Sequence, residues 1–337
     1  MNAAINSGKF SPLRETLPTL DPQWFSCDIS RANLKELMRR RDGPALRNFG
    51  LWLVLLLASG YLAFRCYGTW WALPAFLLYG TIYSSSDARW HECQHGTAFK
   101  TRWLNEFFYE ISSFMTIRES SLWRWSHSRH HTHTIIIDYD PEIQVTRPAD
   151  LLKIACDFLY LYSGAFEVKR IALHAVGVFT PLELDYIPAM ARRRTIRNSR
   201  IYLLILLSVI GSAVALKSFL PLLFVWTPRF YGGWLHQLCA LTQHAGLAEN
   251  VYDHRKSTRT VHINPVYRFL YMNMNYHIEH HMFPTVPYFA LPELHKAVQS
   301  EMPRPYAGII DVYKEIVPAL LRQSRDRYYY VARGVPA

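Results

Sequence analysis

Residues 126–134 read S-H-S-R-H-H-T-H-T, which places His127, His130 and His131 at positions i, i+3 and i+4. Side chains with these spacings lie on one face of an α-helix, so the stretch predicts a helix that presents three imidazoles in one direction. His133 lies two residues further on and off that face, and it is assigned to the surroundings of the site or to the surface. This helix is the first candidate for a metal-binding element.

Two other histidine groups with similar spacing lie far away in the sequence. They are H-E-C-Q-H, with His91 and His95, and H-I-E-H-H, with His277, His280 and His281. The three groups together hold eight of the fifteen histidines. One zinc ion takes about four protein ligands, so eight clustered imidazoles indicate two metal ions. Neutral imidazole is a suitable ligand for zinc, copper, iron or nickel.

Several polar residues close to these groups have other predicted roles. Four carboxylates are predicted to orient the ligand imidazoles through hydrogen bonds, and a bridging role for one of them stays open. These are Glu92, Asp138, Asp140 and Glu279. The isolated histidines are assigned structural roles, and these are His174, His254, His262 and His295.

The composition indicates a membrane protein with a large aqueous part. Half of the 337 residues are hydrophobic and 15% are aromatic, but the mean hydropathy is only −0.03. The net charge of +11 raises the alternative of nucleic-acid binding. The basic residues cluster beside apolar segments, at residues 39–41 and 192–194, as membrane orientation signals do. We therefore expect no nucleic-acid partner, and the five scattered cysteines suggest neither a disulfide framework nor a thiolate zinc site.

Four apolar stretches approach the length of about 20 residues that crosses a bilayer core. They are residues 49–64, 67–86, 201–216 and 219–242. Each pair is joined by a short turn, so the prediction is an all-α membrane protein with about four transmembrane helices in two hairpins. Arg229 lies inside the last stretch and has to snorkel or face protein. Basic residues precede the first hairpin and only Arg65 lies at its tip, which places both of its ends in the cytoplasm.

The polar segments are predicted to form helices outside the membrane. Ser30 is the expected N-cap of a basic amphipathic helix on the membrane surface. Apolar stripes at residues 103–114 and 151–166 predict helices that cap the site or lie at the interface, and residues 309–321 predict another helix. All three histidine groups fall on the cytoplasmic side of the two hairpins. We therefore expect a cytoplasmic helical cap that holds a di-metal histidine site.

The expected organisation has three parts in one multi-pass protein of the inner (cell) membrane. Residues 1–44 form a cytoplasmic lead-in with the amphipathic helix, residues 45–300 form the membrane domain with the di-metal site, and residues 301–337 form a cytoplasmic extension. The N-terminus, the C-terminus and the metal site are all expected in the cytoplasm.

The motifs H-E-C-Q-H, H-S-R-H-H and N-Y-H-I-E-H-H-M-F-P together resemble the three histidine boxes of the membrane fatty acid desaturase and hydroxylase superfamily. The resemblance covers about residues 45–300 and implies a non-haem di-iron centre that activates O2. The iron ligands that it implies are His91, His95, His127, His130, His131, His277, His280 and His281. Members often add one ligand before the third box, and L-T-Q-H at residues 241–244 resembles that position. His244 is therefore the expected ninth ligand, with His236 as its competitor.

The resemblance implies a reaction class but not one product. The expected protein is a membrane di-iron oxidase that uses O2 and external electrons to desaturate or hydroxylate an unactivated C–H site of a fatty acyl or lipid chain. The run Q-H-A-G-L-A-E-N-V-Y-D-H-R resembles a bacterial branch described as hydrocarbon oxygenases, some of which act with Rieske-type ferredoxins on small molecules such as rhizopine. The alternative is therefore a monooxygenase that hydroxylates or oxidatively demethylates a small non-lipid molecule.

Three further inferences concern partners and remaining alternatives. The chain has no C-x-x-C pair, no H-P-G-G motif and no G-x-G-x-x-G loop, so we expect a separate ferredoxin with its reductase. A long apolar tunnel beside the metals would favour an acyl chain, and a short polar pocket would favour a small substrate. A zinc membrane hydrolase and a metal-binding transporter are the remaining hypotheses.

Overall fold

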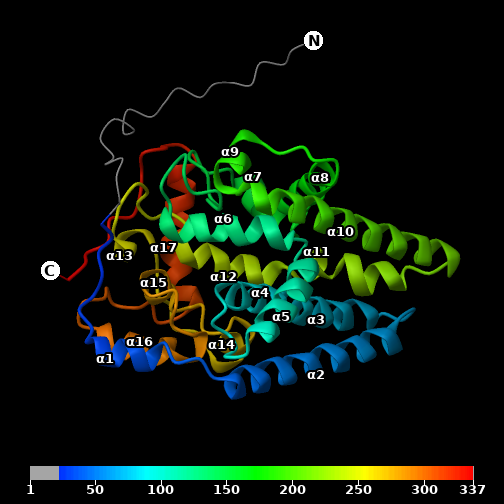
Figure 1. Ribbon diagram of the computed structural model, residues 1–337, viewed down its shortest axis with the longest axis horizontal. Helices are drawn as coiled ribbons and strands as arrows, with labels where there is room; N and C mark the ends of the chain where they lie inside the picture. The colour runs from blue at the N-terminus through cyan, green and yellow to red at the C-terminus, as the bar shows by residue number, and fades with distance from the viewer. Residues whose placement is uncertain (1–22, 337) are drawn as a thin grey trace, which may run out of the picture.

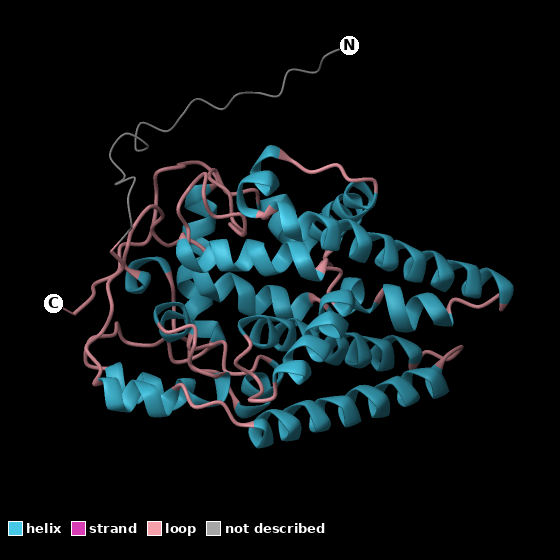
Figure 2. Cartoon of the chain, in the orientation of Figure 1, coloured by secondary structure: helices cyan, strands magenta, loops and turns pink. Residues whose placement is uncertain are grey.

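The structure is a computed structural model that describes residues 23–336, and this part of the chain consists of helices and loops (Figure 2). The first half contains α1 (Arg31–Leu37), α2 (Asp42–Cys66), α3 (Ala72–Ser84), α4 (Ser86–His95), α5 (Arg102–Met115), α6 (Ser120–Thr132), α7 (Leu151–Asp157), α8 (Leu161–Ala175) and α9 (Pro181–Tyr186). The second half contains α10 (Ala189–Ala215), η2 (Leu222–Trp226), α11 (Pro228–Gly232), α12 (Trp234–His244), α13 (His254–Ser257), α14 (Pro265–Leu270), α15 (His277–Met282), η3 (Tyr288–Ala290), α16 (Leu291–Val298) and α17 (Ile309–Gln323). The all-α prediction is confirmed for the described residues.

Two helices, α2 and α10, are long and apolar enough to cross a membrane. On α2 the apolar side chains face outward, with Val54 61% and Leu57 64% exposed. On α10 the same holds for Leu204, which is 66% exposed. Contiguous exposed apolar surface of this kind marks a face that lipid or another protein covers.

The two returning segments are shorter or more broken than the apolar stretches in the sequence. The first turn occupies residues 67–71, and α3 begins only at Ala72. The second returning segment is not one helix but consists of the π-helical turn η2, the short α11 and then α12. Pro228 begins α11 because a proline has no N–H to continue the preceding turn.

Tyrosines on neighbouring turns satisfy the carbonyls of η2. Tyr79 and Tyr83 on α3 donate their hydroxyl hydrogens to the carbonyls of Phe224 and Val225, at 2.9 and 3.0 Å. The Tyr231 hydroxyl donates to the carbonyl of Leu223 at 2.6 Å. In an apolar setting an unpaired carbonyl is costly, so these hydroxyls make the irregular turn tolerable.

The irregular segment packs closely against α3 at a pair of glycines. A Cβ atom added to Gly232 would lie 1.9 Å from the carbonyl carbon of Gly80. Only glycine allows this approach, which holds α11 directly against α3. Because α12 follows α11 and α4 follows α3, the contact also sets the relative position of two helices that carry candidate ligands.

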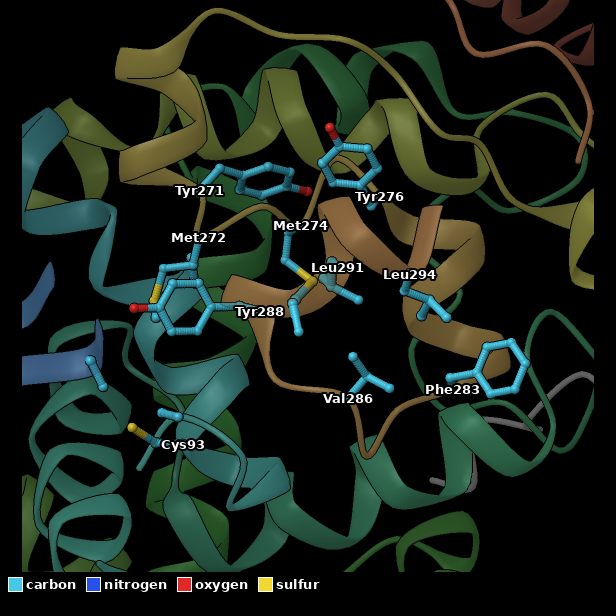
Figure 3. Packing of buried hydrophobic residues seen from close by; sticks show 14 of the residues in the cluster. Cys93, Tyr271, Met272, Met274, Tyr276, Phe283, Val286, Tyr288, Leu291 and Leu294 are labelled. Carbon is cyan, nitrogen blue, oxygen red and sulfur yellow. The ribbon is translucent and has the colours of Figure 1, made fainter. Parts of the chain in front are cut away.

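A large hydrophobic cluster joins α4 to the C-terminal third of the chain. Figure 3 shows part of it, with Cys93 of α4 on one side and Leu291 and Leu294 of α16 on the other. Met272 and Tyr288 lie between them. The cluster therefore fixes the segment that carries α15 against the helix that carries the first histidine group.

The predictions for the polar segments are largely confirmed. Ser30 caps α1, since its hydroxyl oxygen accepts a hydrogen bond from the Asn33 amide at 3.2 Å, and α5 and α17 lie where apolar stripes predicted them. The stretch 151–166 is divided into α7 and α8 at Tyr160, whose φ is 52°. The domain boundaries stay predictions, and residues 1–22 of the lead-in lie outside the described residues.

In Figure 1 the α2–α3 turn and the α10–η2 turn lie at one end of the molecule. Helices α13, α15 and α16 lie toward the opposite end, with the C-terminus. The histidine-bearing helices α4, α6 and α12 lie in the body of the molecule between these ends, and α15 adjoins them from the side of the C-terminus. The site is thus separated from the tips of the long apolar helices.

Candidate metal centre

Three helices carry the histidine groups, and local sequence explains their bounds. Helix α4 ends at His95 because Gly96 follows it in the left-handed conformation, with φ 66°. Helix α6 begins after Glu119, whose carboxylate accepts hydrogen bonds from the amides of Ser121 and Leu122. Within each helix the spacing of three or four residues turns the imidazoles to one side. The predicted helical face at His127, His130 and His131 is confirmed.

Five of the histidines form the first cluster. They are His91, His95, His127, His131 and His280, and one ring nitrogen of each lies within 4.8 Å of one ring nitrogen of every other. The Nε2 atom of His127 lies 2.9 Å from that of His91, 3.2 Å from that of His95 and 3.1 Å from that of His131. The cluster therefore joins all three histidine groups.

Three more histidines form the second cluster, which is His130, His244 and His281. His277 adjoins it, since its Nε2 atom lies 3.1 Å from that of His281. The two clusters touch, because the rings of His131 and His281 are stacked with centroids 4.4 Å apart. All nine residues predicted as ligands lie in or directly beside these two clusters.

The competitors for the ninth position lie in different places. The Nδ1–H of His244 donates to the carbonyl of Ser257 at 2.9 Å, and its buried Nε2 atom has no hydrogen-bond partner among the described residues. His236 instead has its Nδ1 atom 3.4 Å from the carboxylate of Asp87, and it is in neither cluster. Of the two competitors, only His244 therefore lies in a cluster and has a ring nitrogen that is free to bind a metal.

Comparison with known proteins agrees with this geometry. The family model described as "Fatty acid desaturase" matches residues 68–313, which is well over half of the chain. The chain belongs to the fatty acid desaturase family. Its paired histidine clusters are able to hold metal ions, in keeping with the metal site of this membrane-bound family.

Curated relatives resemble only part of this chain. It is 28% identical over 129 residues to the sn-1 oleoyl-lipid 12-desaturase of Anabaena variabilis, covering 38% of this chain and 36% of the relative. It is 33% identical over 114 residues to the sn-1 oleoyl-lipid 12-desaturase of Synechocystis sp., covering 34% and 32%. It is 34% identical over 86 residues to the sn-1 acyl-lipid omega-3 desaturase (ferredoxin) of Synechocystis sp., covering 25% and 24%. The match thus spans about a third or less of each relative.

Two carboxylates accept hydrogen bonds from the Nδ1 atoms of two cluster histidines. The Nδ1–H of His130 donates to Asp140 at 2.8 Å, as the sequence predicted. The Nδ1–H of His127 donates to Glu142 at 2.9 Å, a partner that the sequence reasoning missed. A carboxylate on Nδ1 fixes the tautomer and leaves the Nε2 lone pair for a metal. The position of Glu142 two residues after Asp140 was the available signal.

The other three predicted orienting carboxylates make no hydrogen bond to a cluster histidine, although Oε1 of Glu92 lies 3.8 Å from Nδ1 of His91. Glu279 instead bonds to His295 and to the Thr260 hydroxyl, and so braces α15. Glu92 accepts from the Thr97 hydroxyl at 3.1 Å, and Asp138 is exposed. His254 also differs from its expected isolated role, since its ring lies 5.2 Å from that of His281.

The clustered imidazoles are better suited to binding metal cations than to forming hydrogen bonds with one another. Burial, with smaller contributions from nearby charges, lowers the pKa of His91 and of His95 to about 3, so both imidazoles are neutral near pH 7. Burial and neighbouring imidazoles also hold the pKa values of His127 and His131 well below the usual range. His127 has one Nε2 lone pair, which cannot accept hydrogen bonds from three neighbours at once. Neutral imidazoles converging through Nε2 are the donor set that late first-row metals prefer, so the residues fit two such ions.

A cavity with a mixed polar and apolar lining adjoins both clusters. Its volume is about 340 Å³, and it is lined by His91 and His127 of the first cluster and by His130 and His244 of the second. Four more lining side chains are ionisable. Glu142 comes from the loop after α6, Lys153 and Asp157 come from α7, and Glu167 comes from α8. Aromatic rings of α8 and its N-cap, Tyr160, Tyr162 and Phe166, complete that side. The cavity is the space in which a substrate could reach the metals.

Proposed function

We propose that this desaturase-family protein binds two iron ions and uses O2 and external electrons to desaturate or hydroxylate an unactivated C–H site of a fatty acyl or lipid chain. The observation that carries the proposal is the pair of touching, buried histidine clusters. The similarity to acyl-lipid desaturases of Anabaena variabilis and Synechocystis sp. supports the substrate class.

Nine histidines are the proposed ligands of the two ions. His91, His95, His127, His131 and His280 would hold one ion, and His130, His244, His277 and His281 would hold the other. Bound iron would supply the reactivity toward O2 and the electron transfer that breaking an aliphatic C–H bond requires. An all-imidazole set without thiolates is suited to iron in such a role.

The chain's own residues orient the ligands and exclude water. Asp140 and Glu142 keep the Nδ1 protons of His130 and His127, so that Nε2 of each ring faces the metals. His127 and His130 are only 4% and 5% exposed, and this burial protects a reactive oxidant from bulk solvent. In desaturation the substrate loses two hydrogens, and O2 with two donor electrons and two protons becomes two waters. In hydroxylation one oxygen atom enters the substrate and the other becomes water.

The proposed arrangement in the inner membrane has four crossings. Helices α2 and α3 form one hairpin, and α10 with the η2–α12 segment forms the other. Support comes from the exposed apolar faces of α2 and α10 and from the basic residues at their starts. This arrangement places both ends of the described chain and the metal site in the cytoplasm, with residues 45–300 as the membrane domain and residues 301–337 as a cytoplasmic extension.

The charged side chains on the wall of this cavity favour a second candidate function. A volume of about 340 Å³ is near the lower end of ligand pockets, which span roughly 300–1,000 Å³. Lys153, Asp157 and Glu167 on its wall suit a molecule with hydrogen-bonding groups better than a long apolar chain. The second candidate is therefore a monooxygenase that hydroxylates or demethylates a small non-lipid molecule, with a Rieske-type ferredoxin as donor.

One experiment tests both candidates. The iron-loaded protein in lipid nanodiscs is given a ferredoxin, its reductase, NADPH and O2, together with phospholipids or with small polyols and amines. Products are identified by mass, as a loss of two hydrogens or a gain of one oxygen. Acyl-chain products support the first function, and products from small molecules alone support the second. His130→Ala should abolish either product, whereas His262→Ala, outside both clusters, should not. Full turnover by His130→Ala would exclude the proposed site.

A further inference from the structure

A column of aromatic rings runs from a half-buried tryptophan to the second histidine cluster. Trp24 stacks on His254 with ring centroids 4.1 Å apart and planes only 2° from parallel. His254 is 3% exposed, and its ring lies 5.2 Å from that of His281. Tyr252 meets the edge of Trp24 at 5.3 Å. The rings of Trp24 and His254 therefore connect the candidate ligand His281 with the outside of the described chain.

Hydrogen bonds hold Trp24 and the short helix that carries His254 in place. The indole N–H of Trp24 donates to the carbonyl of Thr132, the last residue of α6, at 3.2 Å. The Asp253 carboxylate accepts from the Arg255 amide at 3.0 Å and so caps α13, the short helix that begins with His254. Trp24 thus touches the helix that carries three candidate ligands and also stacks on the ring beside a fourth.

The position of His254 suits contact better than coordination. It belongs to neither group of converging ring nitrogens, and its Nδ1 atom has no hydrogen-bond partner among the described residues. Burying an imidazole nitrogen without a hydrogen-bond partner costs free energy. A function of His254 beside the cluster would explain why this cost is accepted.

We propose that Trp24 and His254 form the route by which electrons pass from a docked ferredoxin to the metal pair. This inference rests on the proposed function. Each reduced ferredoxin loses one electron, the metal pair gains it, and two ferredoxins supply the two electrons that one turnover consumes. Trp24 and His254 undergo no net change.

The donor's docking surface is then the face around Trp24 and Tyr252. Helix α13 lies away from the α2–α3 and α10–η2 turns in Figure 1, so a soluble protein can reach this face when the long apolar helices are in a membrane. Lys256, two residues after His254, is exposed, and the chain carries a net charge of +11. These charges favour an acidic iron–sulfur protein, whose approach they would accelerate at low salt.

The test measures reduction of the metals and not product. The iron-loaded protein is mixed anaerobically with reduced ferredoxin, and the rate of iron reduction is followed by stopped-flow absorbance. Trp24→Leu should lower this rate constant at least about tenfold, whereas Trp24→Phe should retain most of it. Reduction by dithionite, a small ion that needs no docking face, should be equal in all variants. Tyr139→Leu is the matched control, since Tyr139 stacks on His133 near the same end of α6 but outside the column.

Several outcomes would overturn the route. One is an unchanged ferredoxin rate in Trp24→Leu, and another is an equal loss with ferredoxin and dithionite, which would indicate damage to the site. If Trp24→Leu is not stable, Tyr252→Leu and His254→Gln are measured in its place, with iron content determined for each. A protein that binds iron and forms product after dithionite reduction, but shows no effect of these substitutions, retains the proposed function and loses only the route. A protein that binds no iron loses both.

Discussion

Glu142 provides the sharpest test of how the first cluster is held together. Its carboxylate lies 2.9 Å from Nδ1 of His127 and 2.7 Å from the Ser126 hydroxyl. Glu142→Ala removes the acceptor for both groups and leaves a buried imidazole N–H without a partner. His127 then has no fixed tautomer, and its Nε2 atom is free to turn away from His91 and His95.

Two estimates of the effect agree. Losing a hydrogen-bonded carboxylate on a metal-bound histidine typically lowers metal affinity by about 10–100-fold, which is about 1.4–2.7 kcal/mol. Leaving one buried donor unsatisfied costs about 1–3 kcal/mol. We therefore expect Glu142→Ala to weaken one of the two metal sites by about 10–100-fold and to affect the other much less.

The assay is metal content after dialysis against a graded series of iron chelators. Wild type should retain two ions under conditions in which Glu142→Ala retains one. Glu106→Ala is the matched control, because Glu106 pairs with Arg124 in a partly exposed bridge that contacts no cluster histidine. Equal retention of both ions by Glu142→Ala and wild type would refute the role assigned to the carboxylate.

Three further predictions concern the ninth ligand, pH and packing. His244→Ala should lose one metal ion per chain and His236→Ala should keep both, as measured by elemental analysis; the reverse result would move the ninth ligand to His236. The free energy of unfolding of the metal-free protein should fall below pH 6.5, by up to about 1.4 kcal/mol per pH unit for each of His91 and His95. The reason is that both imidazoles have pKa values of about 3 in the folded chain, so between pH 6.5 and 3 only the unfolded chain binds these protons. A melting midpoint by calorimetry that is constant from pH 7.5 to 5 would contradict this. Gly232→Ala should destabilise the protein by about 1–3 kcal/mol, seen as a lower midpoint in detergent, because its Cβ meets the Gly80 backbone; an unchanged midpoint would exclude that contact.

Much of the site could be predicted because it depends on short-range periodicity. The i, i+3, i+4 spacing of His127, His130 and His131 specifies one helical face without knowledge of the fold. The placement of His244 at the predicted cytoplasmic end of its segment was enough to prefer it to His236. In the structure His244 belongs to the second cluster and His236 to neither, and the assignment of His244 as the ninth ligand stays a prediction.

The parts that could not be predicted depend on contacts between distant segments. Glu142 reaches His127 because the loop after α6 folds back onto that helix, and helical periodicity says nothing about such a loop. His254 lies beside His281 because of how α13 packs, and the residues next to His254 in the sequence do not indicate this proximity. The π-helical turn η2 is stable because Tyr79 and Tyr83 of another helix satisfy its carbonyls. None of these contacts leaves a periodic signal in one segment.

The central claim is that two iron ions lie together in the paired histidine clusters. The most direct measurement is elemental analysis with Mössbauer spectroscopy on protein loaded with iron-57 in the absence of O2. We expect two iron ions per chain, in one magnetically interacting pair. That pair should be lost in His131→Ala, because the His131 ring of the first cluster stacks on His281 of the second. One zinc ion per chain, or iron ions that do not interact, would contradict it.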